Sequence, residues 1–278
     1  MSVLEFSLIV GVGSLVAGFL GALTGLGGGV VIVPMLSLLL GVDIRYAIGA
    51  SLVSVIATSS GASAAYVREG ISNIRIGMFL EVATTLGAIA GATLATRIST
   101  SAVSIVFGVV LIGSASLSWK RHPRGAHDAA PDALASRLRL NGSFPEGGGI
   151  RKYNVRRVPL GWGLMFGAGT LSGLLGIGSG AMKVLAMDQA MKIPFKVSTT
   201  TSNFMIGVTA AASAGIYLSR GYIDPGLSMP VTLGVLAGSL LGTRVLVQVD
   251  PKWLRRVFSV VIVVLGSEML YKGISGRI

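Results

Sequence analysis

Cysteine is absent from this 278-residue sequence, and charged residues make up only 12% of it. The lack of cysteine excludes disulfides and thiolate metal sites. The two histidines, His122 and His127, both lie in one polar segment, so the apolar parts of the chain hold no imidazole ligand either. We therefore expect no metal site and no cofactor such as a haem or an iron–sulfur cluster.

Hydrophobic residues are abundant instead, at 52%, with a mean hydropathy of +0.77 and 40 glycines. An average soluble domain carries roughly 25% charged residues, so this composition predicts an all-α polytopic membrane protein in a lipid bilayer. The first apolar run, 6–23, follows "MSVLEF", which has no basic residue. We therefore interpret this run as a membrane helix and not as a cleaved signal peptide.

The net charge of +12 could suggest a nucleic-acid-binding protein, but the distribution of the charge argues against it. Nine of the 23 Lys and Arg residues lie in one polar segment, 120–158. This segment lacks the interleaved aromatic residues that stack on bases in single-strand binders. A cytoplasmic basic linker that follows the positive-inside rule explains the charge, and we expect no nucleic-acid partner.

An internal repeat divides the chain into two halves, 1–119 and 159–278. Residues 25–107 align without a gap on residues 176–258, at a constant offset of 151. Thirteen of the 83 pairs are identical, and six of these are glycine pairs, such as Gly87 with Gly238. Chance would give about 1.3 glycine pairs, so the sequence predicts a duplication.

Each half has five apolar segments, and the second one is short: 26–40 and 178–192. Fifteen helical residues cover about 22 Å, less than the hydrocarbon core, so these are either short steep helices or broken, re-entrant ones. Ten crossings would place 16 basic residues inside and five outside, against 14 and seven for re-entrant segments. The positive-inside rule favours ten crossings. Five crossings per half make the two repeats inverted, as in many secondary transporters.

The short segments begin with glycine clusters, "GLGGG" and "GIGSG". The first cluster is not a P-loop, because no Lys-Ser/Thr follows it. Helices that begin inside a membrane expose N–H donors, and glycine lets a ligand approach them, so we predict an anion pocket where the two clusters meet. Helix packing is the alternative, and we favour it for "GAIAG" and "GSLLG". The predicted site includes Gly27, Gly28, Gly29, Gly178, Ser179 and Gly180.

The sequence resembles the TauE/SafE family of sulfite and organosulfonate exporters. "GLGGGVVIVPML" resembles the N-terminal glycine signature of that family, and "GLLGIGSGAMKVLAM" with "KVSTTTSNFMIGVTAAASAG" resembles its C-terminal counterpart. The resemblance implies a carrier of the bacterial inner membrane that exports small sulfur oxyanions or sulfonates. Ser179 within the second cluster and Leu185 at the position that matches Pro34 depart from the pattern. The resemblance therefore does not identify the exact substrate of this protein.

Two ionisable residues within the apolar segments are functional candidates, because charges there are costly. Lys183 follows the second glycine cluster, and anion contact and snorkelling to the interface are both open for it. Glu81 is a proton-coupling candidate, or else an interface carboxylate near Arg75. Hydroxyl and amide groups of the third segments complete the predicted site, through Ser51, Ser202 and Asn203.

These features predict a secondary transporter, not an enzyme, that exports a small anion by alternating access of two inverted repeats. Two alternatives stay open: a membrane scaffold without transport, whose glycines only pack helices, and an anion channel. The sequence does not decide whether the protein forms a homodimer or which ion drives export.

Overall fold

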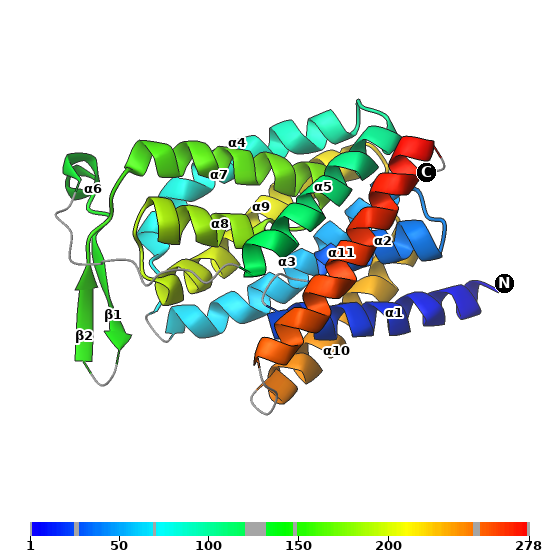
Figure 1. The fold of residues 1–278 in the computed structure, drawn as a ribbon, viewed down its shortest axis with the longest axis horizontal. Helices are drawn as coiled ribbons and strands as arrows, with labels where there is room; N and C mark the ends of the chain where they lie inside the picture. Colours follow the sequence, from blue (N-terminus) through cyan, green and yellow to red (C-terminus); the bar gives the residue numbers. More distant parts are fainter. Residues whose placement is uncertain are drawn as a thin grey trace.

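The computed structural model describes residues 2–24, 28–68, 71–119, 132–146, 149–246 and 251–276. This part of the chain is almost entirely helical and contains one two-stranded β-hairpin (Figure 1). In chain order the elements are α1 (Val3–Thr24), α2 (Gly29–Pro34), the π-helix η1 (Met35–Leu39), α3 (Ile44–Arg68), α4 (Ile74–Ala95), α5 (Thr100–Trp119), α6 (Ala133–Arg137), β1 (Gly142–Glu146), β2 (Gly149–Tyr153), α7 (Val158–Leu175), α8 (Gly180–Leu185), the π-helix η2 (Ala186–Ala190), α9 (Phe195–Ser219), α10 (Pro225–Leu246) and α11 (Pro251–Ser275).

The boundaries of these helices repeat with the offset of 151 that the sequence contains. The elements α2, η1, α3 and α4 begin and end 151 residues before α8, η2, α9 and α10. The π-helical turn occurs in both halves, although Pro34 precedes it in one and Leu185 in the other. Proline is therefore not the cause of the wide turn, and the substitution at this position leaves the local structure unchanged.

Matching side chains start the matching helices. Asn73 caps α4 by accepting a hydrogen bond from the backbone N–H of Ile76 (3.1 Å). Asp224, 151 residues later, caps α10 by accepting one from the N–H of Leu227 (3.0 Å). Each cap satisfies a donor that the first helical turn leaves unpaired, which fixes where the helix begins.

The two halves are interlocked, because the first helix of each packs along the fourth helix of the other. Helix α1 lies against α10 and α7 against α4, while α3 packs on α9 and α5 on α11. A Cβ on Gly87 would collide with the carbonyl oxygen of Phe166, and one on Gly238 with that of Leu15. The packing role expected for "GAIAG" and "GSLLG" is thus confirmed at Gly87 and Gly238.

The bundle has two ends, which we name by their residues. At the Arg45 end, the Arg45 guanidinium at the start of α3 donates to the carbonyl of Ile98 (2.7 Å) and lies over the ring of Tyr222, which follows α9. At the opposite hairpin end, the backbone N–H of Asn73, shortly after α3, donates to Thr201 near the start of α9 (3.0 Å). The corresponding helices α3 and α9 therefore run antiparallel.

The segment between the halves, predicted as a basic linker, contains structure that the sequence did not indicate. Helix α6 is followed by an antiparallel hairpin, in which Gly142 pairs with Tyr153. Phe144 and Tyr153 are buried in one cluster with Ile76 and Leu80 of α4, so the hairpin is docked on the helical body. Residues 120–131 lie outside the described part of the chain.

An apolar outer surface fits a membrane environment. Met78, Val82 and Leu86 lie one turn apart on α4 and are 62%, 57% and 51% exposed. Comparable exposed apolar side chains occur on α1, α7, α10 and α11. Within the described residues, α4 and α7 are each long and apolar enough to cross a membrane. Lipid is the solvent that makes such an apolar surface favourable.

Candidate functional site

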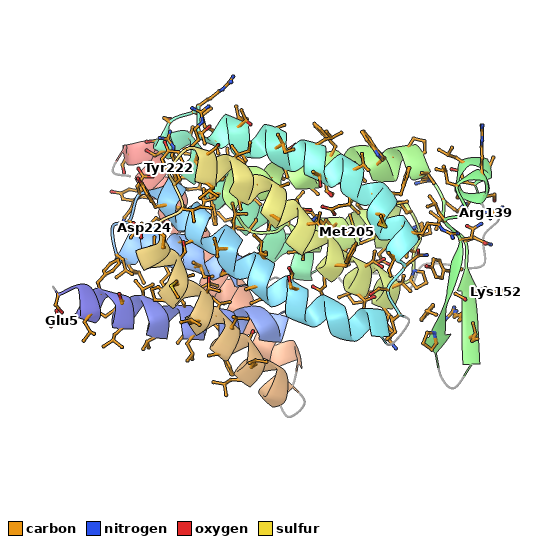
Figure 2. All side chains as sticks on the ribbon, turned by 180° about the vertical axis from the view of Figure 1, so that it is seen from behind. Glu5, Arg139, Lys152, Met205, Tyr222 and Asp224 are labelled. Atoms are coloured by element: carbon orange, nitrogen blue, oxygen red, sulfur yellow. The ribbon has the colours of Figure 1, made fainter. Side chains whose placement is uncertain are left out.

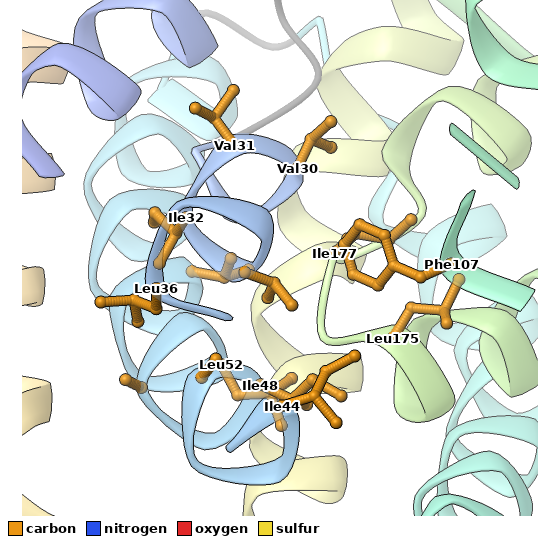
Figure 3. Close-up of a cluster of buried hydrophobic side chains, with 14 of the residues drawn as sticks. Val30, Val31, Ile32, Leu36, Ile44, Ile48, Leu52, Phe107, Leu175 and Ile177 are labelled. Carbon is orange, nitrogen blue, oxygen red and sulfur yellow. The ribbon is translucent and has the colours of Figure 1, made fainter. Parts of the chain in front are cut away.

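The two broken helices bring their glycine-rich turns into contact. Helix α2 begins at Gly29, and the turn between α7 and α8 contains Gly176 and Ile177. A Cβ on Gly29 would lie 2.9 Å from the carbonyl oxygen of Gly176 and 3.4 Å from the Cα of Ile177. Figure 3 shows Val30 and Ile177 in the same buried hydrophobic cluster. The structure therefore joins the two clusters, as predicted, although Gly27 lies outside the described residues.

The first short segment begins halfway along the bundle. A Cβ on Gly28 would lie 3.1 Å from Val235 Cγ1, and Val235 is in the middle of α10. From there, residues 29–39 cover about 16 Å, roughly half of a hydrocarbon core of about 30 Å. Each short segment is therefore too short to cross alone. The loop after the first short segment nevertheless lies at the same end of the bundle as the end of α11, because Lys272 donates to the Leu38 carbonyl (3.1 Å). Ten crossings predict this placement.

The glycines of the predicted site have different surroundings. Gly29 faces the second glycine turn, whereas Gly28 faces Val235 of α10 and Gly18 of α1, which are packing contacts. Gly178 has a φ of +70°, a conformation that glycine adopts without strain. Ser179 also has a positive φ, of 43°. Its hydroxyl donates to the carbonyl of Ala168 (2.6 Å), so Ser179 fixes the turn to α7 instead of capping α8.

Two of the predicted hydroxyl residues form hydrogen bonds to backbone carbonyls at the second glycine cluster. Ser51 Oγ donates to the carbonyl of Gly176 (2.8 Å), which links the first half to the turn of the second. Ser202, the matching residue in the repeat, donates to the carbonyl of Gly180 (3.2 Å). Asn203 is partly exposed, and its side chain makes no hydrogen bond to the described residues. The structure thus brings Ser51 and Ser202 to the glycine turns but not Asn203.

A buried polar triad adjoins the second turn. Lys183, fully buried in α8, donates from Nζ to Thr209 Oγ1 on α9 (2.5 Å). Thr209 in turn donates to Glu81 Oε1 on α4 (2.7 Å). The other carboxylate oxygen, Oε2, is buried and has no hydrogen-bond partner among the described residues. Glu81 is therefore a core residue coupled to Lys183, and the alternative of an interface carboxylate beside Arg75 is wrong.

Thr209 was not identified from the sequence, although a signal was present. It is identical to Thr58 across the repeat, and an identical polar residue in both repeats indicates a shared role. The charges themselves are not repeated, because Ile32 and Thr232 stand where Lys183 and Glu81 would be expected in the other half. One half of the site is thus charged and the other is neutral.

These groups suit an anion better than a metal ion. Among the described residues, no three His, Cys, Asp or Glu side chains are placed to hold a metal. The glycine turns instead combine the start of α8 with a lysine one turn into that helix, and a helix start carries partial positive charge. Hydroxyls of Ser51 and Ser202 add neutral groups at the same turns.

An apolar outer surface, helices that break in the middle of the bundle and buried charged residues beside the breaks are features of a polytopic membrane transporter. The family model described as "Sulfite exporter TauE/SafE" matches residues 10–269. The chain belongs to this family, and it is a membrane transporter.

Relatives along the whole chain carry the same general description. The probable membrane transporter protein YunE of Bacillus subtilis is 28% identical over 98% of this chain and 99% of its own length. The probable membrane transporter protein YdhB of the same organism is 27% identical over 83% of this chain and 84% of its own. No solved structure matches the chain at a significant level.

Proposed function

We propose that this protein is a multi-pass carrier of the bacterial inner membrane that exports a small anion, a sulfur oxyanion or organosulfonate such as sulfite or sulfoacetate. The observation that carries the proposal is the contact between the two glycine-rich turns, with the buried Lys183 one helical turn away. Membership in the TauE/SafE family supports the substrate class. A small anion fits because glycine leaves room beside backbone N–H groups.

The antiparallel arrangement of α3 and α9 supports inverted repeats that alternate between two states. In such carriers the substrate lies where the broken helices meet, and one half rocks against the other. The start of α2 and the break between α7 and α8 meet in this way. Because α1 packs on α10 and α7 on α4, each moving unit would contain helices from both halves.

The buried triad supports a role for Glu81 in proton coupling. A proton on Glu81 would cancel the negative charge of the carboxylate. The ammonium group of Lys183, on the other side of Thr209, would then no longer be attracted to Glu81. An anion could then bind the freed ammonium group, so proton and anion would bind together. The carboxylate of Glu81 accepts hydrogen bonds from Thr85 and Thr209, which are both neutral. The charge that acts on Glu81 is that of Lys183.

Reconstituted protein tests the function directly. We expect saturable uptake of at least one of sulfite, sulfate, thiosulfate and sulfoacetate into proteoliposomes, with no uptake of a cation control. Anion loaded on the opposite side should accelerate this uptake, because a carrier returns faster when it is occupied. Flux that neither saturates nor responds to the loaded anion would indicate a channel. Absence of flux for every anion would support the scaffold alternative.

The distribution of basic residues supports an orientation with the hairpin in the cytoplasm. Arg139, Lys152 and Arg156 lie in the hairpin segment, with Lys192 before α9 and Lys196 in its first turn, whereas the Arg45 end has fewer basic residues. Positive residues stay on the cytoplasmic side of bacterial membranes. Both termini would then face the periplasm.

Single cysteines in this cysteine-free chain should report that orientation. Ser2, Ser143 and Ser275 are all exposed, so each can be replaced by cysteine without disturbing the core. In whole cells, we expect an impermeant maleimide to label Ser2→Cys and Ser275→Cys but not Ser143→Cys. Permeabilised cells should give labelling of all three. Labelling of Ser143→Cys alone in whole cells would reverse the orientation.

A further inference from the structure

A cavity at the hairpin end lies apart from the glycine turns. It has a volume of about 290 Å³ and is lined by the turn before α4, by the start of α4 and by the turn that leads into β1. The residues that give it polar character are Ser72, Arg75, Arg139, Asn141 and Ser143. Figure 2 shows Arg139 at the base of the hairpin, beside the helical body.

The walls of this cavity are fixed by hydrogen bonds. Arg75 donates to the carbonyl of Arg139 (3.0 Å), which ties α4 to the segment before the hairpin. Asn73 donates to the hydroxyl of Tyr153 (2.7 Å). Burial raises the pKa of the Tyr153 phenol, with the Asn73 hydrogen bond opposing in part, so this hydroxyl stays protonated at physiological pH. Asn141 accepts from the backbone N–H of Val155 (2.9 Å), which leaves its amide donors for a ligand.

The cavity presents donors and positive charge. Two guanidinium groups, two serine hydroxyls and the amides of Asn73 and Asn141 line it, and none of the described lining residues is acidic. The hydroxyl oxygen of Ser72 is buried and has no hydrogen-bond partner among the described residues. A buried hydroxyl without a partner is costly, and a bound oxygen atom would remove that cost. The N–H groups of Ile74 and Arg75 also find no partner within α4, because they lie in its first turn.

We propose that this cavity is a second oxyanion-binding site, separate from the site at the glycine turns. Its ligand would carry at least two charged or strongly accepting oxygens, as a sulfate, a sulfonate or a phosphate group does, since guanidinium groups bind such oxygens in pairs. The phosphate of an anionic lipid headgroup and a soluble oxyanion share this chemistry. A ligand bound to both arginines would join the hairpin segment to α4.

Binding of inorganic sulfate and phosphate to the purified full-length protein tests the site. Arg139→Asn removes one charge but keeps a residue that tolerates the left-handed backbone at this position, where φ is 52°. Ser72→Ala removes the unpartnered hydroxyl. Lys152→Gln is the matched control, because Lys152 is an exposed basic residue of β2 that does not line the cavity.

In calorimetric titrations, Arg139→Asn should weaken oxyanion affinity roughly tenfold or more, and Ser72→Ala should weaken it several-fold. Lys152→Gln should stay within about twofold, because an exposed charge that does not line the cavity is screened by water and salt. Equal losses in Arg139→Asn and Lys152→Gln would overturn the proposal, since they would reflect net charge alone. Unchanged affinity in both Arg139→Asn and Ser72→Ala would also overturn it.

Vesicle composition distinguishes the two sources of the oxyanion. If lipid phosphate is the ligand, protein in phosphatidylglycerol nanodiscs should bind sulfate more weakly than protein in phosphatidylcholine nanodiscs, and Arg139→Asn should remove this difference. If the ligand is soluble, both nanodiscs should give the same affinity. Both readouts are binding measurements that do not depend on transport, so a failure of the proposed export function would leave this test intact.

Discussion

Lys183→Met is expected to lower the affinity for the transported anion by roughly tenfold to a hundredfold. Methionine keeps the length and the apolar bulk of the side chain but removes the buried positive charge beside the second glycine turn. A hydrogen bond to a charged group contributes about 1.5–3 kcal/mol, which corresponds to this range of affinity. Calorimetry or a thermal shift with each sulfur anion would measure the loss.

The double variant Lys183→Met/Glu81→Gln separates binding from stability. Lys183→Met alone leaves Glu81 buried without its charge partner, which destabilises the protein for reasons unrelated to the ligand. Neutralising both residues should restore stability but not affinity. Lys196→Met, at an exposed position on α9, should behave as the wild type. Wild-type affinity in folded Lys183→Met would show that Lys183 is not a ligand.

Glu81→Gln alone should retain anion binding while flux loses its dependence on pH.

Much of the architecture could be predicted because glycine spacing reflects backbone contacts. Gly87 and Gly238 recur at the same offset since each lies against a carbonyl oxygen of a neighbouring helix, where no other residue fits. Because the same requirement occurs in both halves at one offset, the repeated glycines are visible in one sequence. The same glycine spacing indicated the break between α7 and α8, where Gly176 and Gly178 have positive φ.

Other features depended on contacts between distant segments, which one sequence does not reveal. Glu81 and Lys183 lie in different halves, and only the packing of α4 against α9 brings them to the same threonine. The interface position considered for Glu81 followed from its nearness in sequence to Arg75. In the structure, Arg75 points to the segment before the hairpin instead.

The amino-acid composition of the hairpin gave no signal for β-strands. Its strands, "GSFPE" and "GIRKY", are short and polar, and only Phe144 and Tyr153 anchor them to the bundle. A strand of five residues with one buried side chain gives almost no alternating pattern, so a loop was the natural expectation. Its stability comes from docking on α4, which periodicity cannot report.

Gly29→Val is expected to abolish transport by separating the two glycine turns. A Cβ at this position would lie 2.6 Å from Ser51 Oγ and 2.9 Å from the Gly176 carbonyl oxygen, so the backbone of one turn would have to move. Ser51 would then lose its hydrogen bond to Gly176, which links the halves. Forcing extra atoms into a packed core costs about 1–3 kcal/mol, which many proteins survive. Flux per folded molecule in proteoliposomes is the measurement.

Controls on neighbouring glycines decide whether the effect belongs to the contact between the turns. Gly163→Val on α7 meets no atom within 4 Å and should retain full flux. Gly28→Ala would approach Val235 Cγ1 at 3.1 Å, a side-chain atom that can shift, so it should retain most of the flux. If Gly29→Val folds and transports like the wild type, the close contact between the two turns is not needed for transport.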